Sequence, residues 1–198
     1  TPAMRYAKDR KENTHKIIVE KAAESFVGNG YAISGIKEVM QSAGLTKGGF
    51  YAHFKSKEEL LEEVLTLRLG RTLANITSLF EKGESDKAVQ GLADNYLSTA
   101  HRNNPSEGCP IPRLASELPH VKPSTRKRYD DEIGLIIQEV ADHVPLKTSA
   151  KKREWAMGFM SMLVGGLVLS RSIKNQELSD ELLRATRKKA KELVILYK

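Results

Sequence analysis

Residues 44–60 read GLTKGGFYAHFKSKEEL, and this stretch decides how the rest of the sequence is interpreted. Gly44 can end one helix in a tight turn, because glycine adopts backbone conformations that other residues avoid. The spacing that follows predicts a short helix over residues 47–54, with Phe50 and Phe54 one turn apart and buried. The small and polar residues of that helix are then left for its surface.

A second short helix precedes this one and begins at Ser34 or Gly35. Two short helices joined by residues 43–45 form a helix-turn-helix, whose second helix enters the major groove of DNA. An amphipathic helix over about residues 10–28 comes before them and completes a three-helix unit with a small core. After the motif, Ser56 begins a long helix, with the glutamate of a capping box three residues later.

The charge of the chain is concentrated in its N-terminal third. The 198 residues carry 32 Lys and Arg against 25 Asp and Glu, which gives a net charge of +7. Residues 1–57 hold 10 basic and 5 acidic residues, whereas the remainder holds 22 and 20. The total alone fits nucleic acid, a membrane surface or an acidic substrate. Its position around the helix-turn-helix favours double-stranded DNA.

The predicted recognition helix supplies small and polar residues where it would meet base edges. Gly48 and Gly49 lack side chains, so the backbone there can approach the groove closely. Lys47 can read guanine acceptors. Tyr51 and His53 flank the buried phenylalanines and can donate to phosphate oxygens. On spacing alone, a core aromatic and an ordinary surface histidine remain the alternatives for these two.

Further candidates for phosphate contacts lie beside the recognition helix. Thr46 can cap its first turn through the side-chain hydroxyl. Lys57 adds its charge to the N-terminal dipole of the next helix, which favours an anion. Lys8, Arg10 and Lys11 form either an arm that reaches the minor groove or a disordered basic tail.

The stretch 44–60 resembles the signature of TetR-family transcriptional regulators, and Ala22, Phe26 and Tyr31 fit the same pattern. The resemblance is specific over residues 14–64. It implies an all-helical, dimeric protein with an N-terminal DNA-binding domain and a larger C-terminal domain that binds an inducer.

The resemblance also implies roles for individual residues. It assigns contacts with bases and the groove to Lys47, Gly48 and Gly49, and contacts with the phosphate backbone to Thr46, Tyr51, His53 and Lys57. Ser34 stands where the family usually has a pair of threonine or serine residues, so we expect a phosphate contact there as well. Gly49 stands where many members carry a polar side chain, which leaves Lys47 as the main candidate for base readout.

The rest of the sequence also shows helical patterns, which gives an all-α chain of about nine helices. The long ones are expected over residues 86–102, 124–143, 151–174 and 178–197. We divide the chain into a DNA-binding helix-turn-helix domain, residues 1–57, and a larger regulatory and dimerisation domain, residues 58–198.

Three features of the sequence bear on where the protein acts and on whether it enters a membrane. The first 25 residues lack the apolar stretch of a secretory signal, and the single Cys109 excludes an internal disulfide framework. We therefore expect the cytoplasm. The uncharged residues 155–170 are too few to span a bilayer, so they are expected in a core or subunit interface.

Two long helices carry apolar faces that a twofold partner would cover in a four-helix interface, giving a homodimer. The candidates are Leu135, Ile136, Val140, Leu163, Val164, Leu167 and Val168. Gly165 and Gly166 would allow close approach of the partner backbone. The alternative for most of these residues is the core of the same chain.

A pocket for a small-molecule inducer is expected in the second domain, walled by large or polarisable residues from different helices. The candidates are Tyr96, Cys109, Trp155, Phe159 and Met160. Each has the alternative of an ordinary core residue. Cys109 also invites a reading as a sensor of oxidants or electrophiles.

The sequence contains no HExxH, CxxC or GxSxG motif, and its five histidines do not cluster. We therefore expect no catalysis, no metal and no other cofactor. The function predicted is a ligand-responsive repressor that binds a palindromic operator as a dimer and is released by an inducer. The alternatives are an activator or architectural DNA binder without an inducer, and a helical ligand-binding or enzymatic protein that does not use DNA.

Overall fold

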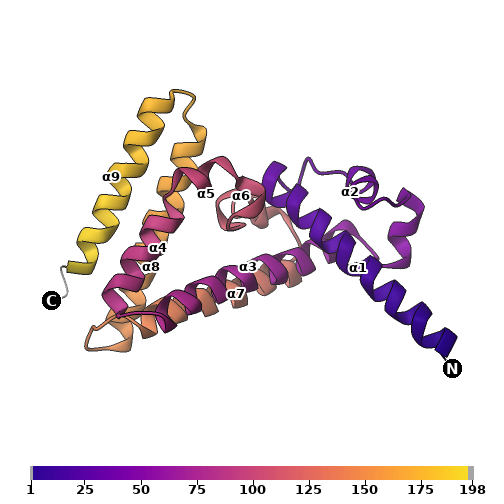
Figure 1. Ribbon diagram of the computed structural model, residues 1–198, viewed down its shortest axis with the longest axis horizontal. Coiled ribbons are helices and arrows are strands. Elements are labelled where there is room, and N and C mark those ends of the chain that lie inside the picture. The colour runs from indigo at the N-terminus through magenta and orange to yellow at the C-terminus, as the bar shows by residue number, and fades with distance from the viewer. Residues whose placement is uncertain (1, 196–198) are drawn as a thin grey trace.

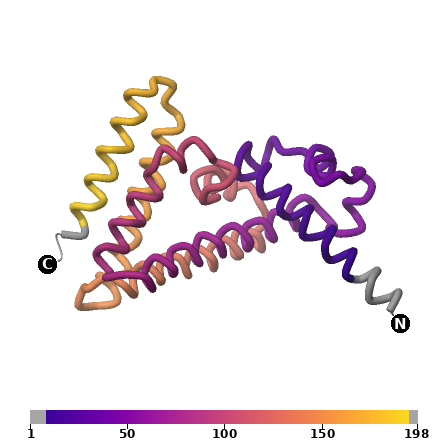
Figure 2. Tube along the Cα trace, in the orientation of Figure 1, coloured from indigo at the N-terminus to yellow at the C-terminus, as the bar shows by residue number. Residues whose placement is uncertain are grey.

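The computed structural model describes residues 2–195 of the chain, with side chains over residues 9–193. Within this range it contains helices and connecting segments but no strand, so the predicted all-α class is confirmed. The helices are α1 (Pro2–Asn29), α2 (Ile36–Ser42), the 3-10 helix η1 (Lys47–Ala52), α3 (Lys57–Glu81), α4 (Ser85–Tyr96), α5 (Thr99–Asn103), η2 (Pro105–Glu107), α6 (Ile111–Leu114), η3 (Leu118–His120), α7 (Pro123–Asp142), α8 (Ser149–Ser172) and α9 (Gln176–Ile195). Figures 1 and 2 show their arrangement.

The N-terminal unit consists of α1, α2 and η1, as the sequence predicts. Its core contains Phe26, Phe50 and Phe54, all almost completely buried. Helix α1 begins well before the predicted start near residue 10. The predicted basic arm or tail is thus part of α1 over its described residues. Arg10 and Lys11 are exposed on that helix, whereas the side chain of Lys8 lies outside the described residues.

The predicted recognition helix corresponds to η1, which differs from the prediction in length and type. It is a single 3-10 segment that ends at Ala52, two residues before the predicted end. The predicted Thr46 cap is wrong, because its side chain makes no capping hydrogen bond. Two consecutive glycines have a low helix propensity, and 3-10 geometry is common in such short pieces. Gly44 has φ +72°, in the left-handed region that the tight turn was expected to need.

Helix α3 connects the N-terminal unit to the rest of the molecule. It begins at Lys57 behind Ser56, whose Oγ accepts a hydrogen bond from the Glu59 backbone N–H at 3.1 Å. The predicted cap is confirmed. Helices α3 and α7 lie side by side along one edge, and α4, α8 and α9 form a second arm (Figure 1). The short segments from α5 to η3 join the two arms and contact α1.

The apolar residues 155–170 lie within α8. Phe159, Leu163 and Leu167 from this run are completely buried, so one side of the run forms core within the chain, whereas Met157, Val168 and Leu169 are exposed. Over residues 2–195, no helix combines the length and the apolar character that crossing a membrane requires.

Candidate nucleic-acid interface and candidate ligand pocket

The first residues of η1 and the residue before them bring three of the predicted base-contacting or phosphate-contacting residues together at the surface. Thr46, Lys47 and Gly48 are exposed in succession, and no atom would meet a Cβ added at Gly48 within 4 Å. Gly49 is half-buried, with the Met40 methyl group 3.6 Å from such a Cβ. This segment is therefore accessible from the surface.

A buried aromatic pair holds the exposed segment in place. Phe50 and Phe54 are stacked with ring centroids 5.5 Å apart. Tyr51 lies between them in the sequence but is 65% exposed, with its ring edge against Phe50. The alternative of a core tyrosine is thus excluded, and its hydroxyl is available to a phosphate.

His53 occupies a position between the core and the surface. Its Nδ1 is buried without a hydrogen-bond partner among the described residues, so donation to a phosphate has to come from Nε2. Burial lowers the pKa of His53, and the positive charges of His15 and Lys11 lower it further. The imidazole is therefore neutral near pH 7.

Two predicted phosphate contacts are engaged inside the chain. Ser34 is buried, and its Oγ donates to the Gly30 carbonyl at 2.6 Å. The Lys57 Nζ donates to the Tyr31 carbonyl at 2.5 Å and lies 4.3 Å from the centre of the Tyr31 ring. Burial lowers the pKa of Lys57. Both side chains therefore hold the loop between α1 and α2, and a phosphate would have to share or displace these contacts.

The same N-terminal region matches a known family. Residues 18–64 fit the model described as bacterial regulatory proteins, tetR family. This match places the N-terminal unit in the TetR family. The repressor DhaR of Mycobacterium sp. (strain GP1) is 32% identical over 101 residues, which cover 51% of this chain and 50% of that protein. The chain spans half or less of the length of the curated relatives that match it first.

Solved TetR-family structures share the fold over nearly the whole chain. The reduced form of NemR from E. coli has a TM-score of 0.77 at 17% identity, covering 91% of this chain and 96% of that one. FadR from Bacillus subtilis in complex with stearoyl-CoA has a TM-score of 0.64 at 16% identity, covering 90% and 96%. At such identities the likeness shows the TetR fold alone, including the helical domain after α3.

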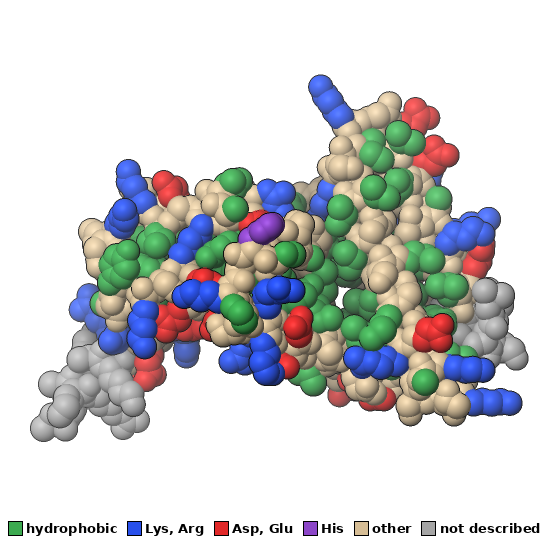
Figure 3. All heavy atoms as spheres, turned by 180° about the vertical axis from the view of Figure 1, so that it is seen from behind, with side chains coloured by type: hydrophobic (Ala, Val, Ile, Leu, Met, Phe, Trp, Pro, Cys, Tyr) green, Lys and Arg blue, Asp and Glu red, His purple; other side chains and the backbone are tan. Residues whose placement is uncertain are grey.

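The predicted ligand-binding residues do not come together in this domain. Tyr96 and Cys109 line a pocket of about 530 Å³ between α3, α4, α5 and the segment before α6. Met160 lines a separate hollow of about 380 Å³ between α6, α7 and α8. Trp155 and Phe159 stack on each other 4.8 Å apart and line neither space. Seen from behind, the C-terminal part is visibly hollowed, with hydrophobic side chains around the opening (Figure 3).

Sequence reasoning missed the helix face that makes up most of the first pocket. Its residues recur at spacings of four, three, four and three along α3: Arg68, Thr72, Asn75, Leu79 and Lys82. This is one side of the helix, and it continues the line of Leu61 and Leu65, which lie seven residues before Arg68 and Thr72. The signal was present as a polar stripe with an arginine at its start, but such stripes usually face solvent.

The predicted dimer residues divide into two groups. Ile136, Val140, Leu163 and Leu167 are buried in the core of the single chain, as their alternative interpretation allowed. Leu135 and Val168 are exposed by 55% and 40%, and Val164 is half-buried. Only this second group is available to a partner.

The two adjacent glycines of α8 also differ from each other. A Cβ at Gly166 would lie 2.6 Å from the Thr186 methyl group of α9, so the close approach there is within the chain. A Cβ at Gly165 would meet nothing within 4 Å. Only Gly165 therefore leaves room for a second chain.

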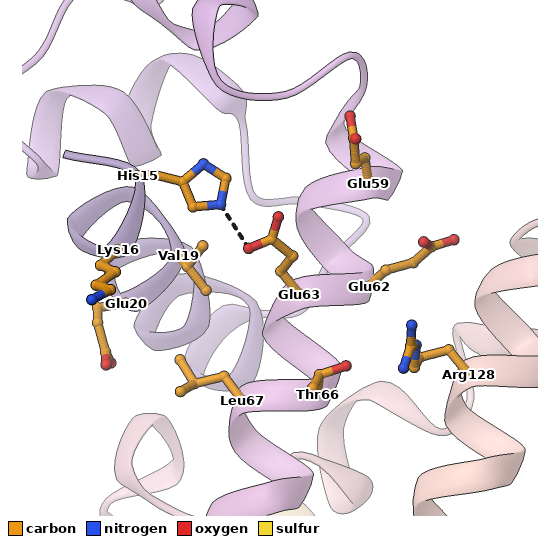
Figure 4. Close-up of a pocket in the computed structure, with 10 residues that line it drawn as sticks. All are labelled: His15, Lys16, Val19, Glu20, Glu59, Glu62, Glu63, Thr66, Leu67 and Arg128. Carbon is orange, nitrogen blue, oxygen red and sulfur yellow. Dashed lines mark hydrogen bonds and ion pairs between the residues drawn. The ribbon is translucent and has the colours of Figure 1, made fainter. Parts of the chain in front are cut away.

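Several polar contacts tie the N-terminal unit to the larger domain. His15 Nε2 and a Glu63 carboxylate oxygen are 2.7 Å apart across a cleft between α1 and α3 (Figure 4). Arg71 of α3 pairs with Glu20 of α1. Glu117, after α6, accepts a hydrogen bond from the Tyr31 backbone N–H at 3.1 Å. These contacts join α1 and the loop that follows it to α3 and to the segment around α6.

Proposed function

We propose that this chain is a ligand-responsive transcriptional repressor that binds operator DNA. The observation that carries the proposal is the exposed run from Thr46 to Gly48, fixed by the buried pair Phe50 and Phe54 within a TetR-family domain. Lys47 is the residue of this run with a side chain long enough to reach base acceptors. The positive charge of residues 1–57 supports binding to the phosphate backbone.

A homodimer is the proposed DNA-binding form, because two recognition helices about one DNA turn apart read a palindrome. Met157, Val164 and Val168 support it, since they lie on one side of α8 and keep exposed apolar surface. Leu135 of α7 adds a further exposed apolar side chain. Partner helices crossing at this face would cover it.

Release by a small molecule is proposed to act through the contacts between α1 and the larger domain. A ligand that favours a conformation with wrongly spaced recognition helices shifts the population away from DNA. FadR, which shares the fold, was crystallised with stearoyl-CoA, and this supports a response to a ligand in a chain of this fold. The proposed site of action is the bacterial cytoplasm, and we assign the chain no catalytic role.

The direct test is selection from a library of random duplex DNA by the purified chain at about physiological salt. Enrichment of an inverted repeat, with half-sites about one DNA turn apart, is the expected result. The matched variants are Lys47→Ala and Lys55→Ala, which each remove one exposed lysine. We expect the first to blur the repeat and the second to preserve it. A library that stays random with the wild-type chain would contradict the proposed function.

A further inference from the structure

Arg68 is a buried cation that forms no ion pair with any of the described carboxylates. Only 5% of the residue is exposed, and its Nη2 donates to the carbonyls of Ser106 and Gly108, each at 2.7 Å. The nearby charges of Glu107 and Glu20 only partly offset its burial. Burying a charge costs several kcal/mol unless an opposite charge compensates. Burial is also the main reason why the pKa of Arg68 is lowered.

Arg102 shows how this chain treats a buried arginine with a purely structural role. It is 7% exposed, and its Nη1 lies 2.6 Å from an Asp180 carboxylate oxygen and 2.7 Å from the Ser179 hydroxyl. Its charge is therefore compensated within the chain. Arg68 is buried to a similar extent, but it lines the 530 Å³ pocket and has no ion-pair partner such as Asp180.

The surroundings of Arg68 define what else the pocket accepts. Two more cations, Arg71 and Lys82, line it, against one acidic residue, Glu107. His101 is neutral near pH 7, because burial lowers its pKa. The Tyr96 hydroxyl is buried beside the Cys109 thiol, and burial is the main reason why the pKa of Tyr96 is raised. The walls also include apolar residues of α3 and α4: Ile76, Leu79 and Leu92.

We propose that this pocket binds an amphipathic organic anion, a carboxylate or sulfonate with an apolar body, whose acid group pairs with Arg68. The apolar body lies against the leucines and Ile76, and a volume of about 530 Å³ suits a molecule of drug-like size. The inference deepens the proposed function, since it names the chemical class of the effector of the proposed repressor.

The same contacts explain how an anion bound in the pocket would affect the DNA-binding unit. Arg68 holds the carbonyls of the segment that includes η2, and η2 packs on α1, where a Cβ added at Gly28 would lie 3.3 Å from Ser106. One turn along α3, Arg71 pairs with Glu20 of α1. An anion competes for both guanidinium groups and so loosens two contacts on the same helix.

The test uses two fluorescent probes that share one apolar scaffold. The probes are 8-anilinonaphthalene-1-sulfonate, which is anionic, and N-phenyl-1-naphthylamine, which lacks the sulfonate. We expect the full chain to bind one anionic probe per protomer, about tenfold or more tighter than the neutral probe, as a charge-assisted hydrogen bond provides. Arg68→Met should abolish this preference, whereas Arg68→Lys and the exposed control Arg126→Met should keep it.

Cys109 reports where the probe binds, because it is the only cysteine and it lines the pocket. The anionic probe should slow the reaction of its thiol with the neutral reagent 4,4′-dithiodipyridine, with half of the effect at the probe's Kd. Should Arg68→Met fail to fold, the exposed variant Lys82→Met is expected to weaken the anionic probe alone, by about twofold to threefold.

Equal binding of the two probes by the wild-type chain, or saturation without protection of Cys109, would overturn the inference. Neither measurement contains DNA. Failure here therefore leaves the proposed DNA binding intact, and a failed duplex selection leaves the pocket intact.

Discussion

Lys47 and Arg68 are both basic residues in candidate binding sites, but the structure places them in opposite surroundings. Lys47 lies exposed on η1, a six-residue helix that contains two glycines. Arg68 lies buried in the middle of α3, a 25-residue helix. The first site is an exposed surface formed by consecutive residues. The second is an interior pocket lined by three helices and a connecting segment. The first is therefore readable from local sequence and the second is not.

The largest expected effect is on stability. It distinguishes the buried residues that support the proposed DNA-binding surface from the exposed residues that form it. Phe50→Ala should lower the free energy of unfolding by about 3–5 kcal/mol, because the ring is completely buried. Tyr51→Ala, at the neighbouring exposed position, should change it by less than about 0.5 kcal/mol and weaken DNA binding. Urea denaturation of both variants measures the difference, and similar losses would refute the assigned orientation of η1.

Two adjacent glycines allow a second comparison between a crowded and an open position, this time in the larger domain. Gly166→Ala should destabilise the chain by about 1–3 kcal/mol, since the added methyl group meets Thr186 and Leu97. Gly165→Ala should stabilise the single chain by up to about 1 kcal/mol, because alanine favours a helix and nothing lies nearby. Thermal unfolding compares the two. If Gly165→Ala instead shifts the chain towards monomer in sedimentation, the partner approaches α8 at this residue.

A smaller effect concerns the exposed apolar side of α8. Val168→Glu places a charge on the face proposed to meet a second chain, at a residue that is 40% exposed. We expect monomers in sedimentation and a marked loss of affinity for a palindromic duplex, with little change in helix content. The control is Thr99→Glu, at an exposed residue of α5. An unchanged oligomeric state would remove this face from the dimer model.

The smallest effect is the pH dependence of stability, which arises in both regions. The folded-state pKa values of His53 and His101 are lowered from about 6.5, mainly by burial. The unfolded chain therefore binds protons first as the pH falls, so stability is present above pH 6.5 and is lost below it. His101 also accepts a hydrogen bond from the Cys109 backbone N–H, which protonation removes.

Denaturation midpoints between pH 7.5 and 5 measure this loss in the wild-type chain, His53→Gln and His101→Gln. Each substitution should flatten the curve below pH 6.5. A wild-type curve that is flat over this window would show that neither imidazole is held neutral by the fold.

The sequence predicted the fold and the exposed site because both depend on short-range patterns. Gly44, the spacing of Phe50 and Phe54, and the Ser56 cap are all local signals, and the structure confirms them. The pocket depends on where along α3 the inward side changes from the apolar Leu61 and Leu65 to the polar Arg68 and Thr72, and periodicity alone does not distinguish a polar stripe that lines a pocket from one that faces solvent. Burial of Ile136 and Leu163 was equally undecided, since apolar faces suit a core or a partner.

The measurement that tests the central claim most directly compares two duplexes by fluorescence anisotropy at one salt concentration. One carries the selected inverted repeat and the other the same bases in scrambled order. The wild-type chain should prefer the repeat by about 10³-fold or more, and Lys47→Ala should reduce that preference by about tenfold. Equal affinity of the wild-type chain for the two duplexes would contradict a role for Lys47 in sequence-specific recognition of DNA.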